Sequence, residues 1–341
     1  MSWKSSVCQS IEYSEGYKQV FAKHVRNITR ELHNHPTAKS TQSIRHLRAS
    51  KVRFDSCTKP MGRFIMYLSA VLATMTEIFQ TKAGKRWKDF KDQLMFLDNE
   101  RIITLAMLAD AGDESLLLAR FYDTGRHDPA TAVQVHEQYR MRIDYLFVQG
   151  HCWKFGFTRH ALAVLQKTYT ICTGNDVKSI GGGVQADVWE RCLQRMRCWV
   201  YLATCTIQAE FPRWEVTQCM SVFKIADSTN NNVNGGNGHG RQMQLQRVAQ
   251  VLGLSADRLA AQIDMVLPYV ASIKGQSESM TTVDAWRSAI QRLSNKKSMR
   301  FWGKVQTLKK ALLRLCAWQG STTSAVEQMF SKLELHRLCK N

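Results

Sequence analysis

The residues of this chain best placed for chemistry lie near its C-terminus. Ser324, Glu327 and Ser331 are three and four positions apart, so a helix would bring the two hydroxyls and the carboxylate to one face. Ser324 and Glu327 also fit a capping box, in which each side chain accepts a hydrogen bond from a backbone amide of the first helical turn. This capping role holds whether or not Glu327 has a chemical role, and the two are compatible.

A helix is the element that must position these side chains. Apolar residues recur after Ser324 at intervals of three and four, which is typical of a helix with one buried face. They are Val326, Met329, Phe330 and Leu333.

The same segment resembles the C-terminal block of hAT-superfamily transposases, whose general form is P-x-[ST]-S-x-x-x-E-R-x-F-S. Ser324, Glu327, Phe330 and Ser331 fall at the matching positions. Gln328 replaces the arginine that normally follows the glutamate.

Two further passages are similar to hAT members and occur in family order. Residues 52–61 resemble the R-W-x-S segment that leads into the family's all-helical insertion, with Phe54 where tryptophan is usual. Residues 210–223 resemble a stretch that some members carry between that insertion and the C-terminal block. Together the three passages span about residues 50 to 335.

The resemblance implies an RNase H-like domain in which two aspartates and a glutamate hold two divalent ions, Mg²⁺ or Mn²⁺. Glu327 matches the glutamate. The family places both aspartates before the R-W-x-S passage, yet Asp55 is the first aspartate of this chain. We therefore expect a chain that resembles a C-terminal portion of the family, with an incomplete catalytic site, no metal or other cofactor and no independent strand-transfer activity.

The family's C-terminal helices contribute to dimerisation, and the family acts on DNA. The resemblance therefore implies a nuclear protein that forms a homodimer or higher oligomer. It assigns the dimer contact to Val326, Met329, Phe330 and Leu333.

The net charge of +19 indicates a polyanionic partner, and nucleic acid is the commonest one. Two stretches concentrate Lys and Arg with few acids to offset them. The alternative is that these cations lie on solvated helix faces and serve solubility alone. The residues predicted to contact DNA are Lys39, Arg45, Arg48, Lys51, Arg53, Lys296, Lys297, Arg300 and Lys304.

Aromatic residues are interleaved with the second basic stretch, as in many nucleic-acid-binding segments. The helical spacing favours a different role for most of them, a buried stripe along one helix. The stripe consists of Phe301, Val305, Leu308, Leu312 and Leu315.

Composition and short motifs argue against a membrane protein, a zinc or disulfide site and a phosphate-binding loop. The 341 residues are 44% hydrophobic, enough for a substantial core, and no apolar run approaches the length of a membrane span, so we expect no membrane partner. The ten cysteines show no C-x-x-C pair or zinc-ligand spacing and predict reduced, buried thiols, including Cys192, Cys198 and Cys205. No phosphate-loop pattern surrounds the glycines at 181–183, so a flexible joint is expected there.

Apolar periodicity predicts a mainly α, multi-helical fold with at most a short strand remnant of an RNase H-like domain near residues 210–224. Separate helices are expected at residues 101–111 and 114–122, and another at 158–171. The expected parts are a basic N-terminal helix and arm (1–60), a helical insertion-like domain (61–227), an Asn/Gly-rich loop (228–240) and a C-terminal helical dimerisation-like region (241–341).

These observations favour a transposase-derived, DNA-associated protein that self-associates. Two alternatives remain open. One is a helical protein-interaction scaffold with no nucleic-acid role. The other is an active two-metal nuclease or transposase whose missing acids come from a partner chain or from unrecognised residues.

Overall fold

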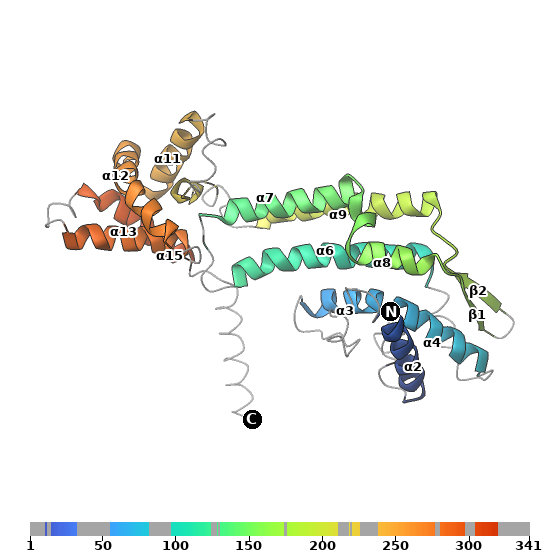
Figure 1. Ribbon diagram of the computed structural model, residues 1–341. Helices are drawn as coiled ribbons and strands as arrows, with labels where there is room; N and C mark the ends of the chain where they lie inside the picture. Colours follow the sequence, from blue (N-terminus) through green and yellow to red (C-terminus); the bar gives the residue numbers. More distant parts are fainter. Residues whose placement is uncertain are drawn as a thin grey trace, which may run out of the picture. The chain divides into compact units, whose positions relative to one another are not determined.

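The computed structural model describes residues 11, 15–32, 55–81, 97–123, 128, 130–173, 176–210, 218, 220–225, 238–276, 280–296 and 304–319. Within these residues the chain forms eleven α-helices and one two-stranded sheet (Figure 1). The predicted mainly helical fold is confirmed. The chain divides into two compact units, one of Met1–Leu116 with Met141–Thr204 and one of Leu117–Arg140 with Cys205–Asn341.

The first unit consists of helices and one β-hairpin, which lies between its last two α-helices in the sequence. Its α-helices and strands are α2 (Glu15–Leu32), α3 (Asp55–Met66), α4 (Leu68–Thr81), the greater part of α6 (Asn99–Asp123), α8 (Gly156–Leu165), β1 (Tyr169–Thr173), β2 (Asp176–Ile180) and the greater part of α9 (Ala186–Glu210).

Helix α4 lies in the core of this unit, where it contacts both α2 and β1. Val71 and Leu72 are fully buried, and Lys23 on α2 forms a 3.0 Å ion pair with Glu77. Among the described residues no single helix is long and apolar enough to cross a membrane. The bent pair Lys59–Met66 and Leu68–Gln80, at 64°, meets that test only when its two parts are counted together.

The two strands form an antiparallel hairpin in which Tyr169 pairs with Ile180 and Thr173 with Asp176. The helix predicted for residues 158–171 is therefore too long, because α8 ends at Leu165 and β1 follows. Thr, Tyr and Ile dominate the strand, and these residues favour extended backbone. Ile171 is buried on the hairpin's inner face.

A strand was also expected near residues 210–224. The described part of that segment contains none, since Ser221–Phe223 form a single 3₁₀ turn, η6. Residues 211–217 lie outside the described part, as does most of the expected loop at 228–240.

Helix α6 is continuous, whereas two helices separated by Gly112 were expected. Gly112 is buried within it, so the glycine serves close packing and does not end the helix. A glycine inside a helix costs only about 1 kcal/mol relative to alanine, which packing can offset.

The N-terminus of α8 is capped by a residue of α6. The Asp110 carboxylate accepts hydrogen bonds from the amides of Phe157 (2.7 Å) and Thr158 (2.9 Å), and from the Thr158 hydroxyl (2.6 Å). Phe155, which occupies the N-cap position, supplies no side-chain bond. Gly156 has a φ of +62°, and a side chain there would overlap the Asp110 carboxylate. Asp110 thus replaces the missing local cap.

The second unit packs α11 (Gly238–Leu252), α12 (Ala256–Gly275), α13 (Thr282–Lys296) and α15 (Gln306–Gln319) around one core, with α12 contacting the other three. Trp286 is fully buried at its centre and donates to the carbonyl of Phe223 at 2.8 Å. Pro268 lies inside α12, and the helix continues past it to Gly275.

Helix α7 (Ala132–Ile143) belongs largely to this unit. Asp128 precedes it, accepting a bond from the Ala130 amide at 3.1 Å, as expected for a residue that opens a helix. The buried ring of His136 on α7 lies 2.5 Å from the Tyr122 hydroxyl. Burial lowers the pKa of His136 to about 4.

Candidate nucleic-acid interface

Helices α13 and α15 each bury one apolar face and expose a basic one. Val305, just before α15, and Leu308 and Leu312 on it are buried, which confirms the predicted stripe at these three positions. Lys304 and Lys310 are exposed on the same segment. The apolar spacing of three and four fixes the rotation of the helix about its axis, so the cations between those positions must face solvent.

The sequence that forms this surface contains no Asp or Glu from Ala285 to Val326. Its cations therefore have few counter-charges. Arg287 reaches Asp284, which lies just before this segment, at 3.4 Å. No salt bridge joins Arg292, Lys304 or Lys310 to an acid among the described residues.

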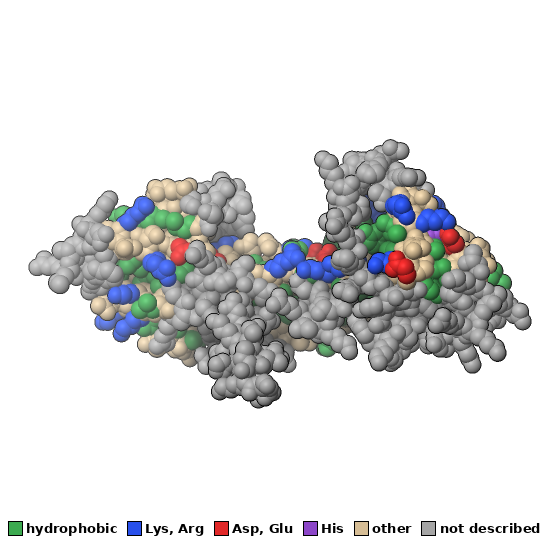
Figure 2. Space-filling model, turned by 90° about the horizontal axis from the view of Figure 1, so that it is seen from below, with side chains coloured by type: hydrophobic (Ala, Val, Ile, Leu, Met, Phe, Trp, Pro, Cys, Tyr) green, Lys and Arg blue, Asp and Glu red, His purple; other side chains and the backbone are tan. Residues whose placement is uncertain are grey.

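Figure 2 shows Lys and Arg side chains spread over the surface of α11–α15, at the left of that view. Cations in α11 and α12 have acids closer at hand, as in the 2.9 Å ion pair of Arg241 with Asp264. The cations of α13 and α15 therefore have fewer acidic partners than those of α11 and α12.

Two helix starts in this region are held by side chains from other helices or loops. Gln262 of α12 accepts a 2.8 Å bond from the Leu308 amide in the first turn of α15. Asp128 accepts a 2.7 Å bond from the Thr282 amide at the start of α13. These bonds satisfy amides that have no partner within their own helix and so fix both basic helices on the core.

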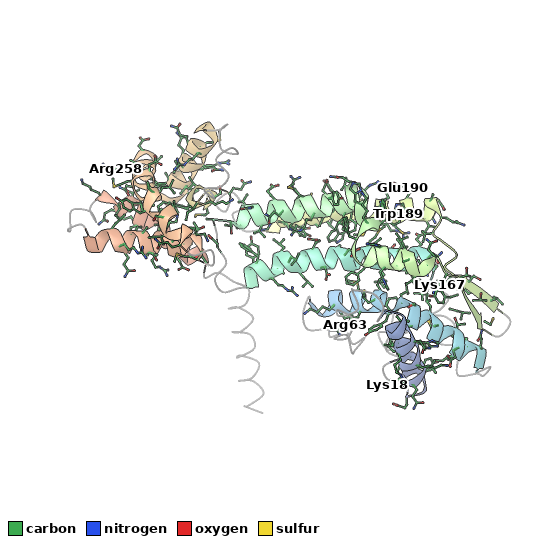
Figure 3. All side chains as sticks on the ribbon, viewed as in Figure 1. Lys18, Arg63, Lys167, Trp189, Glu190 and Arg258 are labelled. Atoms are coloured by element: carbon green, nitrogen blue, oxygen red, sulfur yellow. The ribbon has the colours of Figure 1, made fainter. Side chains whose placement is uncertain are left out.

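In the first unit, by contrast, clustered arginines are engaged by acids. Arg191 on α9 bonds Glu100 at 2.9 Å and Asp187 at 2.7 Å, and Arg195 also pairs with Glu100. The hydrogen bond from Arg191 is the main reason that the pKa of Glu100 is lowered. Glu190, which lies on α9 in Figure 3, pairs with Arg197 at 2.5 Å. This cluster is suited to holding α6 against α9.

The glycine triplet is fixed by hydrogen bonds, in contrast to the expected flexible joint. Asn99 accepts from the Gly181 amide at 2.8 Å and donates to the carbonyls of Gly181 and Gly183 at 3.1 and 2.9 Å. The amides of Gly182 and Gly183 donate to the carbonyls of Lys167 and Leu165. All three glycine amides are thus occupied, so they are not available to a phosphate group.

The described cysteines show no sign of nucleophilic chemistry where they are buried. Burial raises the pKa of Cys152 to about 12 and also raises that of Cys192, so both thiols stay protonated at neutral pH. The packing role predicted for Cys192 is confirmed, whereas Cys198 is exposed and Cys205 is partly exposed. Within the described ranges no three His, Cys, Asp or Glu side chains gather closely enough to hold a metal ion.

The structure places only part of the predicted site. Lys304 is exposed at the start of the α15 segment, and Lys296 is the last residue of α13. The remaining predicted residues lie outside the described part of the chain. They are Lys39, Arg45, Arg48, Lys51, Arg53, Lys297 and Arg300, the dimerisation positions Val326, Met329, Phe330 and Leu333, and Glu327.

Lys310 belongs to the basic region that the sequence indicates before Ser324, although it was not among the residues predicted to contact DNA. Arg292 was missed, and the signal that identifies it is the long interval without acids, which the search for local basic clusters did not use. No known protein family, curated protein or solved structure matches this chain.

Proposed function

We propose that this protein is a transposase-derived, DNA-associated protein that binds DNA through the basic faces of α13 and α15. The observation that carries the proposal is the acid-free segment from Ala285 to Val326, whose described cations lie exposed on helices fixed to a common core. Cations held on a rigid surface without nearby acids suit the phosphate backbone, since each contact releases counterions.

The hAT resemblance around Ser324 and Glu327 supports an origin in a transposase and a self-associating, nuclear protein. In this proposal the chain has no independent strand-transfer activity. In this proposal Glu327 contributes a helix cap, and the neighbouring apolar positions join two copies. These positions are Val326, Met329, Phe330 and Leu333.

The test measures binding of the full chain to a fluorescently labelled DNA duplex by anisotropy over a range of salt concentrations. The test variant combines Lys304→Gln with Lys310→Gln. If both cations contact phosphate, the slope of log affinity against log salt falls by about two. Affinity at 0.1 M salt then falls by about 60-fold, by the same relation.

The matched control combines Arg247→Gln with Arg258→Gln, two exposed cations of the same unit that lie on α11 and α12 (Figure 3 labels Arg258). It removes the same charge and should change the slope little. Equal losses in both variants would show that binding follows net charge alone and has no site on α13 and α15. Absence of salt-sensitive binding by the unmodified chain would favour the interaction scaffold.

Metal-dependent nicking tests the remaining alternative. The full chain should not cut supercoiled DNA in Mg²⁺ or Mn²⁺. Nicking that disappears in Glu327→Gln would instead show an active two-metal enzyme, because this substitution removes the charge a metal needs and keeps most of the cap.

A further inference from the structure

Four aromatic side chains gather at one turn of the first unit. The turn joins a π-helix, η4 (Asp144–Val148), to a 3₁₀ helix, η5 (His151–Lys154), and ends just before α8. We name Tyr145, His151, Trp153 and Phe155 the aromatic cluster. The Tyr145 ring lies 4.5 Å from that of His151 and 6.4 Å from that of Phe155, centroid to centroid.

Three of the four rings of this cluster are exposed, and His151 is partly exposed, although buried residues anchor the backbone beneath them. Trp153 and Phe155 are each 52% exposed and Tyr145 is 38% exposed. Between them in sequence, Phe147 and Cys152 are fully buried. Gly150, with a φ of +74°, allows the sharp reversal between the two helical turns. Phe147 and Cys152 fix the turn on the core, and the backbone after Cys152 leaves Trp153 and Phe155 on the outside. The exposure of these rings therefore follows from the conformation of the turn.

The charge around the cluster favours an anionic partner. The Lys154 ammonium lies 5.3 Å from the centre of the Trp153 ring, and Arg159 is exposed one turn into α8. The acid of this turn, Asp144, accepts a 2.9 Å bond from the Gln149 side chain. Cations next to exposed ring faces are the combination that binds bases by stacking and their phosphates by charge.

A purely apolar partner would not need this arrangement. Exposed aliphatic residues alone would serve it equally well, whereas here the aliphatic Val148 (41% exposed) is accompanied by three exposed rings with a cation beside one of them. Duplex DNA offers no unstacked bases to such rings, while a single strand presents one base face after another.

We infer that the aromatic cluster binds unpaired bases of a nucleic acid, with Trp153 and Phe155 as the stacking surfaces and Lys154 and Arg159 as the phosphate contacts. The inference rests on the proposed DNA association and extends it, because it assigns single-stranded segments to the first unit and duplex to the second.

The test uses the full chain with three labelled ligands: a duplex, an oligonucleotide of thymidines, and an oligonucleotide containing 2-aminopurine, whose fluorescence falls on stacking. The variant combines Trp153→Leu with Phe155→Leu, which keeps apolar area and removes the ring faces. We expect roughly tenfold weaker single-strand binding and loss of the 2-aminopurine quenching, with duplex binding unchanged.

The matched control is Tyr201→Leu, which removes a ring that is 74% exposed on α9 of the same unit, outside the cluster. It should leave all three signals unchanged. Far-ultraviolet circular dichroism verifies that each variant folds. A second variant, Lys154→Gln with Arg159→Gln, should lower single-strand affinity and reduce its salt dependence.

The outcomes separate this inference from the proposed function. One outcome would overturn the stacking role and keep the DNA association. In it, Lys304→Gln with Lys310→Gln loses duplex binding, while the cluster variant binds single strands as tightly as the unmodified chain does. Loss of self-association in the cluster variant, seen by sedimentation with unchanged oligonucleotide binding, would make the cluster a contact between two copies. Failure to bind any nucleic acid would overturn both proposals.

Discussion

Replacing Asp110 by alanine tests whether α8 depends on a cap from another helix. The change leaves the buried amide of Thr158 and the partly buried amide of Phe157 without their acceptor. Each such amide costs about 1–3 kcal/mol when it loses its partner. Burial raises the pKa of Asp110, which shows that the carboxylate itself is costly to bury, and its removal offsets part of the loss. We expect a net loss of about 3 kcal/mol.

The loss in the free energy of unfolding is measured by urea unfolding of the full chain. The local opening of α8 is measured by amide hydrogen exchange. Amides at the start of α8 should exchange much faster, while those of α4 change only with global stability. Arg120→Ala, at an exposed position of the same helix, is the control and should stay within about 0.5 kcal/mol of the unmodified protein. A loss in Asp110→Ala as small as in the control, or unchanged exchange in α8, would refute the capping argument.

Two further predictions concern glycine and histidine. Gly156→Ala should lower the free energy of unfolding, measured in urea, by at least about 2 kcal/mol more than Gly253→Ala does. Both glycines have a positive φ, but only at Gly156 would the new Cβ overlap Asp110. Equal losses in the two variants would contradict this reasoning. Stability should fall by about 3 kcal/mol as pH drops from 6.5 to 4, since the unfolded chain protonates His136 first. Unfolding curves of His136→Gln should lack that part of the pH dependence, and an unchanged slope would exclude His136 as its source.

The helices and the buried stripe of α15 could be predicted because both follow from spacing along the chain. Val305, Leu308 and Leu312 recur at three and four positions, and any helix with that pattern has one apolar face. The same rule placed Lys304 on the exposed side. Local periodicity was sufficient for this stripe, but not for residues 169–171, which were expected in a helix and form part of β1.

The cap of α8 could not be predicted, because its acceptor lies 48 residues before Thr158 in the sequence. The start of α13 is similar, since Asp128 and Thr282 are 154 positions apart. No local signal connects such residues. The flexible joint expected at the glycines was wrong for the same reason, as Asn99 comes from another helix.

The aromatic cluster was not predicted, because it lies between two helical patterns and no apolar periodicity covers Trp153 or Phe155. The helical pattern that places Tyr139, Ile143 and Phe147 on a buried face is correct for those residues. The backbone then changes to a π-helix and a 3₁₀ turn, which alters the rotation per residue and brings Trp153 and Phe155 to the surface. Gly150 was the visible sign of that change.

The hydrogen bonds between Asn99 and the glycine triplet also limit how early the first unit can complete its fold during synthesis. Asn99 leaves the ribosome 82 residues before Gly181, its first partner. At translation rates of about 5–20 residues per second, this interval lasts about 4 to 16 seconds. During that time the first turn of α6 lacks a contact that completes it, and α9 does not yet exist. The hydrogen bonds between Asn99 and the glycines can therefore form only several seconds after α6 has been synthesised.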